Sequence, residues 1–237
     1  MRLPSVIPPG VCAIYFDAVG TVIHPRPSAG AVYADIGRRF GSQLDAGEVK
    51  RRFAVAFQAE EDADARHGHR TDESRELERW WRIVDQVLDD VRDREACFAA
   101  LYVHFAEPSA WTVDPSAASV LNALRRDGYQ VGLATNFDHR LRSVLAGLPA
   151  LEALDDVVIS SEVGWKKPAA GFFAELTARR ALVPNQVLLV GDDLENDYAG
   201  ATAAGLHARL LDPTGACPVP LEHRLAALAD LVAPGVR

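Results

Sequence analysis

The stretch VCAIYFDAVGTVIHP, residues 11–25, determines the fold of this chain. It begins with a short apolar run rich in β-forming residues, which predicts a strand buried on both faces. The run ends at a carboxylate, Asp17, and the apolar Val19 follows two positions later. Parallel sheets contain such strands and bind ligands beyond their carboxyl ends, so Asp17 is a candidate site residue.

The second half of the chain alternates between strands and helices. Helix 116–128 ends at Gly128, and Pro168 is expected in the first turn of helix 168–180. This alternation favours right-handed crossovers. We therefore expect an α/β fold, a Rossmann-like doubly wound parallel sheet with helices on both faces. The predicted strands are 129–135, 155–160, 186–192 and 207–212, and the further helices are about 139–147 and 197–205.

The region from Ser28 to about Phe105 has a different character. Its apolar residues recur at helical spacing and no convincing strand interrupts them, which predicts an insert of about four helices. We expect a core domain of residues 1–25 plus 110–237 and a helical cap domain of residues 26–109. Aromatic residues at helical spacing predict the core of this cap: Phe53, Phe57, Trp80 and Trp81.

Composition limits the classes of partner. The 237 residues are 49% hydrophobic and 24% charged, which is typical of a soluble globular protein. The net charge of −8 and the lack of a basic cluster argue against nucleic-acid binding, and no apolar run has the ~18 residues of a membrane span. Three distant cysteines predict reduced thiols in a cytoplasmic protein. The proline-rich N-terminus MRLPSVIPPG does not resemble a signal peptide.

Polar residues follow several of the predicted strands. Because parallel strands end at one edge of the sheet, these residues are expected on a common rim. A lysine pair before a helix joins them. The set comprises Asp17, Thr135, Asn136, Lys166, Lys167, Asp192, Asp193 and Asp197.

Four motifs in this order resemble those of the haloacid dehalogenase-like hydrolase superfamily. They are FDAVGTV, LATN, GWKKP and VLLVGDDLENDYAGA, and the resemblance covers essentially the whole chain. The helical insert is similar to the cap of the branch that includes phosphoglycolate phosphatase and haloacid dehalogenase. The resemblance implies a hydrolase, most simply a phosphatase that acts on a small phosphorylated metabolite.

The resemblance also implies roles for individual residues. Asp17 would be the nucleophile, and Thr135 and Lys167 would bind the phosphoryl group. Asn136 and Gly20 would help to bind substrate. Mg²⁺, a hard ion that takes oxygen ligands, would be held by Asp17, Asp192 and the backbone carbonyl of Val19. Asp193 and Asp197 would lie behind the residues that bind substrate and metal directly. Asp197 would orient Lys167 or a metal-bound water. Lys166 is expected to be solvated.

Val19 departs from the family pattern. Phosphatases of this family carry a second Asp there, which protonates the leaving group and then activates water. Valine does neither, and general acid–base catalysis contributes ~10²–10⁴-fold to a rate. His24 is a candidate substitute, although a linker position near the solvent is the simpler interpretation.

Three functions stay open on this sequence. The first is a Mg²⁺-dependent phosphatase that works slowly through Asp17. The second is a non-catalytic interaction or regulatory protein that keeps the fold. The third is a metal-independent 2-haloacid dehalogenase, which Val19 and the pair Asp192-Asp193 fit less well. The sequence does not fix the oligomeric state.

Overall fold

A computed structural model describes residues 6–232, so the first five residues of the N-terminal segment considered above lie outside it. Its main feature is a six-stranded sheet in which every neighbouring pair is parallel. In spatial order the strands are β5 (Asp156–Ile159), β4 (Gln130–Thr135), β1 (Ala13–Phe16), β6 (Val187–Gly191), β7 (His207–Leu211) and β8 (Arg224–Leu225). The predicted α/β fold is confirmed.

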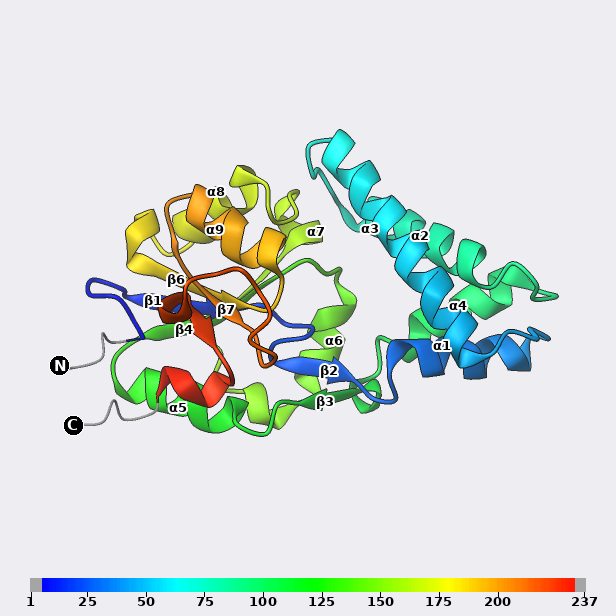
Figure 1. The fold of residues 1–237 in the computed structure, drawn as a ribbon, viewed down its shortest axis with the longest axis horizontal. Coiled ribbons are helices and arrows are strands. Elements are labelled where there is room, and N and C mark those ends of the chain that lie inside the picture. Colours follow the sequence, from blue (N-terminus) through cyan, green and yellow to red (C-terminus); the bar gives the residue numbers. More distant parts are fainter. Residues whose placement is uncertain (1–5, 233–237) are drawn as a thin grey trace.

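Helices cover both faces of this sheet (Figure 1). Ile14 and Phe16 of β1 pack in one apolar core with α5 and α6, whereas Ala13 and Tyr15 pack in another with α8 and α9. This alternation follows from the two-residue period of a strand and explains why the apolar run is continuous. The helices are α5 (Ala117–Arg126), α6 (Arg140–Ala146), α7 (Ser160–Val163), α8 (Ala170–Ala178) and α9 (Gly200–Ala203).

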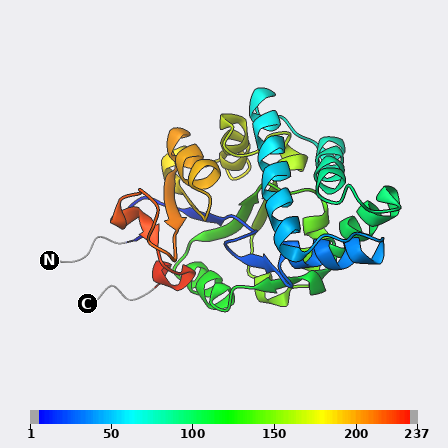
Figure 2. The same ribbon diagram turned by 45° about the vertical axis from the view of Figure 1, so that its right-hand side comes forward.

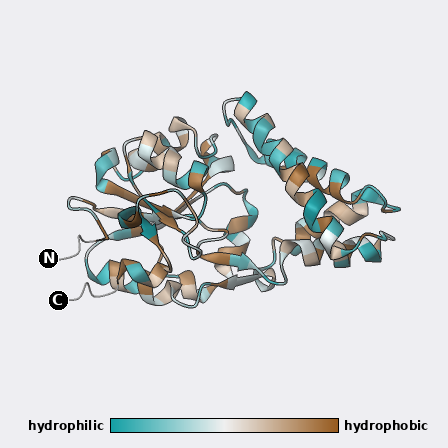
Figure 3. Ribbon diagram, in the orientation of Figure 1, coloured by the Kyte–Doolittle hydropathy of each residue, from teal (hydrophilic) through white to brown (hydrophobic). Residues whose placement is uncertain are grey.

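Four helices between β2 (Ile23–Pro25) and β3 (Trp111–Val113) form a separate group with its own apolar core (Figures 1 and 2). They are α1 (Ala29–Arg39), α2 (Ala46–Arg66), α3 (Glu73–Val87) and α4 (Arg94–His104). Asp45, Asp72 and Asp93 start α2, α3 and α4 by accepting a hydrogen bond from a backbone N–H of the first turn. Figure 3 shows mixed colours along these helices and a more uniformly hydrophobic sheet. We call this group the cap; its proposed extent, residues 26–109, stays a prediction.

Two strands connect the cap to the sheet domain. β2 (Ile23–Pro25) and β3 (Trp111–Val113) pair antiparallel where the sequence predicts only linkers. Each strand is three residues long and its partner is remote in the chain, so neither has a periodic signal of its own. The two connections therefore leave the sheet domain side by side.

The structure corrects smaller expectations. Pro168 lies before α8, which begins at Ala170, so it is not in the first helical turn. The segment expected as helix 197–205 divides into a π-helical turn, Leu194–Ala199, and the short α9. The strand β8 was not predicted, because it has only two residues. Within residues 6–232, no helix combines the length and apolarity needed to cross a bilayer.

Candidate active site

The site lies at the carboxyl ends of three adjacent strands. β1 sits between β4 and β6, and Phe16 aligns with Leu133 on one side and with Val190 on the other. The residues that follow these strands therefore meet at one edge. Asp17, Thr135 and Asp192 all line the same cavity there, as the strand pattern predicted.

Lys167 joins two of the acidic residues. Its Nζ lies 2.7 Å from Oδ1 of Asp17 and also donates a hydrogen bond to Oδ1 of Asp197. The lysine is 1% exposed and Asp197 is 2% exposed. The GWKKP motif thus places a cation beside the expected nucleophile, and Asp197 orients it.

Burial and charge set the ionisation of this group. Burial disfavours the charged form of Lys167, but Asp17 and Asp197 outweigh it, so the pKa of Lys167 is raised. Burial raises the pKa of Asp197 to about 7, with Lys167 opposing and Asp17 adding to the rise. Asp192 lines the cavity. Desolvation of its carboxyl by the surrounding protein raises its pKa, and repulsion from Asp17 raises it further. The site concentrates negative charge.

Thr21 and Gly20 of the first motif position Asp192 of the last motif. Thr21 Oγ1 donates a 2.8 Å hydrogen bond to Oδ1 of Asp192. Gly20 has a φ of +94°, and a Cβ at that position would lie 2.3 Å from Oδ2 of Asp192. Glycine is therefore required for this close approach, which is a different use of Gly20 from the expected substrate contact.

Two further site residues act on the backbone. Asn136 accepts a 2.8 Å hydrogen bond from the Lys167 N–H and donates a 2.9 Å bond to the Lys167 carbonyl. Its amide therefore positions Lys167, although the residue still lines the cavity. Asp193 accepts hydrogen bonds from the N–H groups of Glu195 and Asn196 at 2.8 Å each, so its carboxylate caps the turn that follows.

The acidic residues suit a hard divalent cation. Asp17, Asp192 and Asp197 each offer a carboxylate oxygen, and these oxygens lie within 4.8 Å of one another. Oxygens on opposite sides of one Mg²⁺ are about 4 Å apart. A cation between Asp17 and Asp192 would relieve the repulsion that raises the pKa of Asp192. The donor set and spacing therefore fit such an ion.

Comparison with known proteins agrees with this geometry. The family model of haloacid dehalogenase-like hydrolases matches residues 12–205, which contain all the site residues described above. The chain belongs to the haloacid dehalogenase-like hydrolases. The resemblance implied by the four motifs is thus confirmed.

This haloacid dehalogenase-like hydrolase is similar to several known proteins. The haloacid dehalogenase-like hydrolase domain-containing protein 3 of Bos taurus is 30% identical over 229 residues, which cover 92% of this chain and 90% of that protein. Ribulose-1,5-bisphosphate 5-phosphatase of Halopiger xanaduensis is 36% identical over 101 residues, 42% of each chain. A solved dehalogenase superposes with a TM-score of 0.72 at 20% identity, covers 94% of this chain and 96% of its own, and shows a shared fold.

In this haloacid dehalogenase-like hydrolase, Val19 lines the cavity together with Asp17 and is 36% exposed. His24, the candidate substitute acid, pairs with Thr112 across the β2–β3 ribbon and is not among the described residues that line the cavity. The neighbouring Pro25 lines it instead. No acid or base therefore replaces the missing Asp from that position in the described structure.

Lys166 corrects an expectation from the sequence. It is 2% exposed rather than solvated, and its Nζ lies 2.5 Å from Oδ2 of Asp64 and 3.1 Å from Oε1 of Glu61, both in α2. Its partners come from the cap, about one hundred residues earlier, so local sequence gives no sign of them. The two lysines of GWKKP thus face different parts of the molecule: Lys167 pairs with Asp17 at the end of β1, and Lys166 pairs with Asp64 and Glu61 of the cap.

Other contacts tie the cap of this hydrolase to the sheet domain. The guanidinium of Arg70 lies 3.6 Å from the ring centroid of Trp165. Glu73, in the first turn of α3, accepts hydrogen bonds from the His139 N–H at 3.1 Å and from the Ser161 hydroxyl. In Figure 1 α7 lies above the sheet and the β2–β3 ribbon lies below it, so the cap meets the sheet domain at two separate places.

Glu76 of α3 provides a pH test of this boundary. It is 3% exposed and accepts a hydrogen bond from Thr71, and burial raises its pKa above the ordinary 4.5, with Lys166 and Arg79 opposing. When the pKa of an acid is higher in the folded state than in the unfolded state, the free energy of unfolding falls as the pH rises above the unfolded-state pKa. Glu76→Gln should therefore increase the free energy of unfolding more at pH 8 than at pH 5, as measured by urea denaturation.

The control for that experiment is Glu78→Gln on the same helix, because the Glu78 side chain is 67% exposed. This variant should change stability little at either pH. An equal effect of Glu76→Gln at pH 5 and pH 8 would show that the buried carboxylate does not carry the predicted electrostatic penalty.

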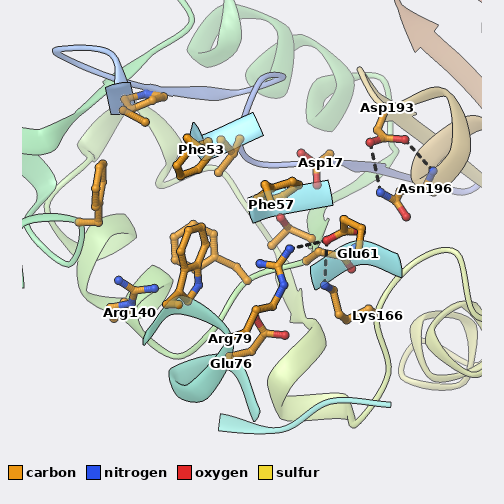
Figure 4. Close-up of a pocket in the computed structure, with 18 of the residues that line it drawn as sticks. Asp17, Phe53, Phe57, Glu61, Glu76, Arg79, Arg140, Lys166, Asp193 and Asn196 are labelled. Carbon is orange, nitrogen blue, oxygen red and sulfur yellow. Dashed lines mark hydrogen bonds and ion pairs between the residues drawn. The ribbon is translucent and has the colours of Figure 1, made fainter. Parts of the chain in front are cut away.

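The cavity between cap and sheet domain measures about 380 Å³ (Figure 4). Its floor is the acidic site, and its wall is mostly aromatic. Phe53, Phe57 and Trp80 pack against the cap core, as expected, but they also line the cavity; Trp81 packs on Phe98 and does not line it. The remaining aromatic wall residues are Tyr33, Phe98, Tyr102, Phe105, Trp111 and Phe137.

Proposed function

We propose that this hydrolase is a Mg²⁺-dependent phosphatase that acts on a small phosphate ester through an aspartyl-phosphate at Asp17. The arrangement of Asp17 carries the proposal: its carboxylate is 2.7 Å from the buried ammonium of Lys167 and close enough to Asp192 to share a cation. The partial similarity to a bisphosphate phosphatase supports the same chemistry. A cytoplasmic location and the absence of a nucleic-acid partner stay predictions.

In the first step a carboxylate oxygen of Asp17 attacks phosphorus. The bond from phosphorus to the ester oxygen breaks, and its electron pair leaves with that oxygen. Lys167 bonds Oδ1 of Asp17, which leaves the second oxygen for attack, and its charge offsets the repulsion between two anions. Thr135, at the end of β4, lines the cavity where its hydroxyl can donate to a phosphoryl oxygen.

In the second step water attacks the aspartyl-phosphate. The bond between phosphorus and Asp17 breaks, the carboxylate is restored, and one proton of the water passes to a phosphoryl oxygen. Val19 offers no base to take that proton. Splitting a displacement through a covalent intermediate still lowers the barrier, so we expect a slow enzyme.

Asp17 and Asp192 would hold Mg²⁺ with the backbone carbonyl of Val19, as the resemblance implies. Mg²⁺ supplies neutralisation of the phosphoryl charge when it is bound. Asp197 already accepts a hydrogen bond from Lys167, so it would support these ligands rather than bind the metal directly.

The test is capture of beryllium fluoride, a mimic of the phosphoryl group on a carboxylate. Fluorine NMR with Mg²⁺ should show one bound species, which should be absent from Asp17→Asn and after EDTA treatment. No bound species in the folded wild-type protein would contradict the phosphatase and favour the non-catalytic alternative. Chloride release from a 2-haloacid in EDTA would instead indicate the dehalogenase.

A further inference from the structure

We infer that the substrate is a phosphate monoester of an aromatic hydroxyl, a phenol-type compound that carries no second anionic group. This inference rests on the proposed function and specifies its substrate class. Three independent features of the cavity lead to it: the aromatic wall, the paired charges and the apolar Val19.

The aromatic wall is continuous from one cap helix to the next. Tyr33 of α1 contacts Phe53 edge-on with ring centroids 5.2 Å apart, Phe53 stacks on Phe57 at 5.8 Å, and Phe57 lies 6.5 Å from Trp80 of α3. Phe53, Phe57 and Trp80 are only partly buried, so part of each ring is available to the cavity. Figure 4 shows the neighbouring rings of Phe53 and Phe57. Aromatic rings prefer such offset and edge contacts with one another, so this wall suits a planar ring.

The cations that line the cavity already have partners. Arg140 bonds both oxygens of Asp138, at 2.8 and 2.6 Å, and Arg79 bonds Glu61. Lys166 bonds Asp64 and Glu61. Lys167 bonds Asp17 and Asp197, so every lysine and arginine among the described lining residues is paired with a carboxylate. A second phosphate or carboxylate on the substrate would therefore be buried without a free counter-charge.

Val19 selects for the acidity of the leaving group. Without an acid at this position, the ester oxygen departs as an anion and takes its proton from water afterwards. A phenol ionises near pH ~10, as the tyrosine side chain does, whereas an aliphatic alcohol is a far weaker acid, about as weak as water. Aryl esters therefore need the missing proton least, and the aromatic wall binds the same group.

The test compares two inert ligands, benzylphosphonate and propylphosphonate, with Mg²⁺ present. Trp80 and Trp111 line the cavity, so their fluorescence reports binding. Benzylphosphonate should bind about 10- to 100-fold more tightly, since an aromatic contact and ring burial each add about tenfold. Equal affinities would overturn the inference.

Two neighbouring tryptophans provide a test variant and its matched control. Trp80→Leu should reduce the preference for benzylphosphonate to within about threefold, because it removes a wall ring. Trp81→Leu should keep the preference, because Trp81 does not itself line the cavity and contacts the wall only from behind, through Phe98. Loss of the preference in Trp81→Leu but not in Trp80→Leu would also overturn the inference.

Failure here is distinguishable from failure of the proposed function. Capture of beryllium fluoride on Asp17 combined with equal affinities for the two phosphonates would leave the phosphatase intact and reject only the aromatic substrate. A benzyl preference that Trp80→Leu removes supports the substrate class directly, and phenyl phosphate should then be hydrolysed at least about 100-fold faster than propyl phosphate.

Discussion

Val19→Asp should accelerate hydrolysis of alkyl phosphates by about 10²–10⁴-fold, measured as kcat/KM with propyl phosphate and Mg²⁺. Val19 lines the cavity beside Asp17, so a carboxyl there can protonate the leaving oxygen. The position is 36% exposed, and substitutions at such positions change stability by only about 0.5 kcal/mol. The gain should be smaller for phenyl phosphate, whose leaving group needs less protonation.

The control for this gain is Val19→Asn, because the asparagine side chain has nearly the same shape as aspartate but transfers no proton. It should leave the rate within about threefold of wild type. If Val19→Asp binds beryllium fluoride normally but is no faster than Val19→Asn, the missing acid is not what limits this enzyme.

Lys167→Met should lower kcat/KM for phenyl phosphate by at least about 10³-fold, because it removes the ammonium 2.7 Å from Asp17, the proposed nucleophile. It should also destabilise the fold by about 3–5 kcal/mol, since Asp17 and Asp197 lose their buried counter-charge. Without the lysine the pKa of Asp197 rises further above its present value of about 7. The raised pKa makes the stability deficit larger at pH 8 than at pH 6 in metal-free buffer.

Two variants separate these effects. Lys167→Met combined with Asp197→Asn should recover part of the lost stability, because one buried carboxylate is gone, but none of the activity. Lys166→Met removes the adjacent buried lysine, so it should destabilise the cap contact with Asp64 and still capture beryllium fluoride. Full activity in Lys167→Met would refute the role given to this lysine.

The positions of the chemical groups could be predicted from local sequence. Asp17, Thr135 and Asp192 each follow a continuous apolar run, and parallel strands bring their ends to one edge, so their meeting follows from the fold class. The four cap helices are also local features, each with helical apolar spacing and three with an acidic N-cap. The absence of an acid at Val19 needs no structure at all.

Contacts between remote segments could not be predicted in this way. Lys166 and Lys167 are neighbours of the same type, yet one pairs with Asp64 of the cap and the other with Asp17 of the sheet. The β2–β3 ribbon joins segments that are too short to show a period.

The sequence by itself determined the five longer strands of the sheet, the four cap helices, the acidic edge and the absence of an acid at Val19, because periodicity and strand ends are local properties of the chain. Only the tertiary structure decided that the Asn136 side chain bonds the backbone of Lys167 and that Lys166 pairs with Asp64 of the cap. It also decided that Phe57 and Trp80 face a cavity as well as a core. The reason is physical: helical spacing tells which side of a helix is apolar, but only the packing of helix against sheet decides whether that side is filled by protein or left open to a ligand.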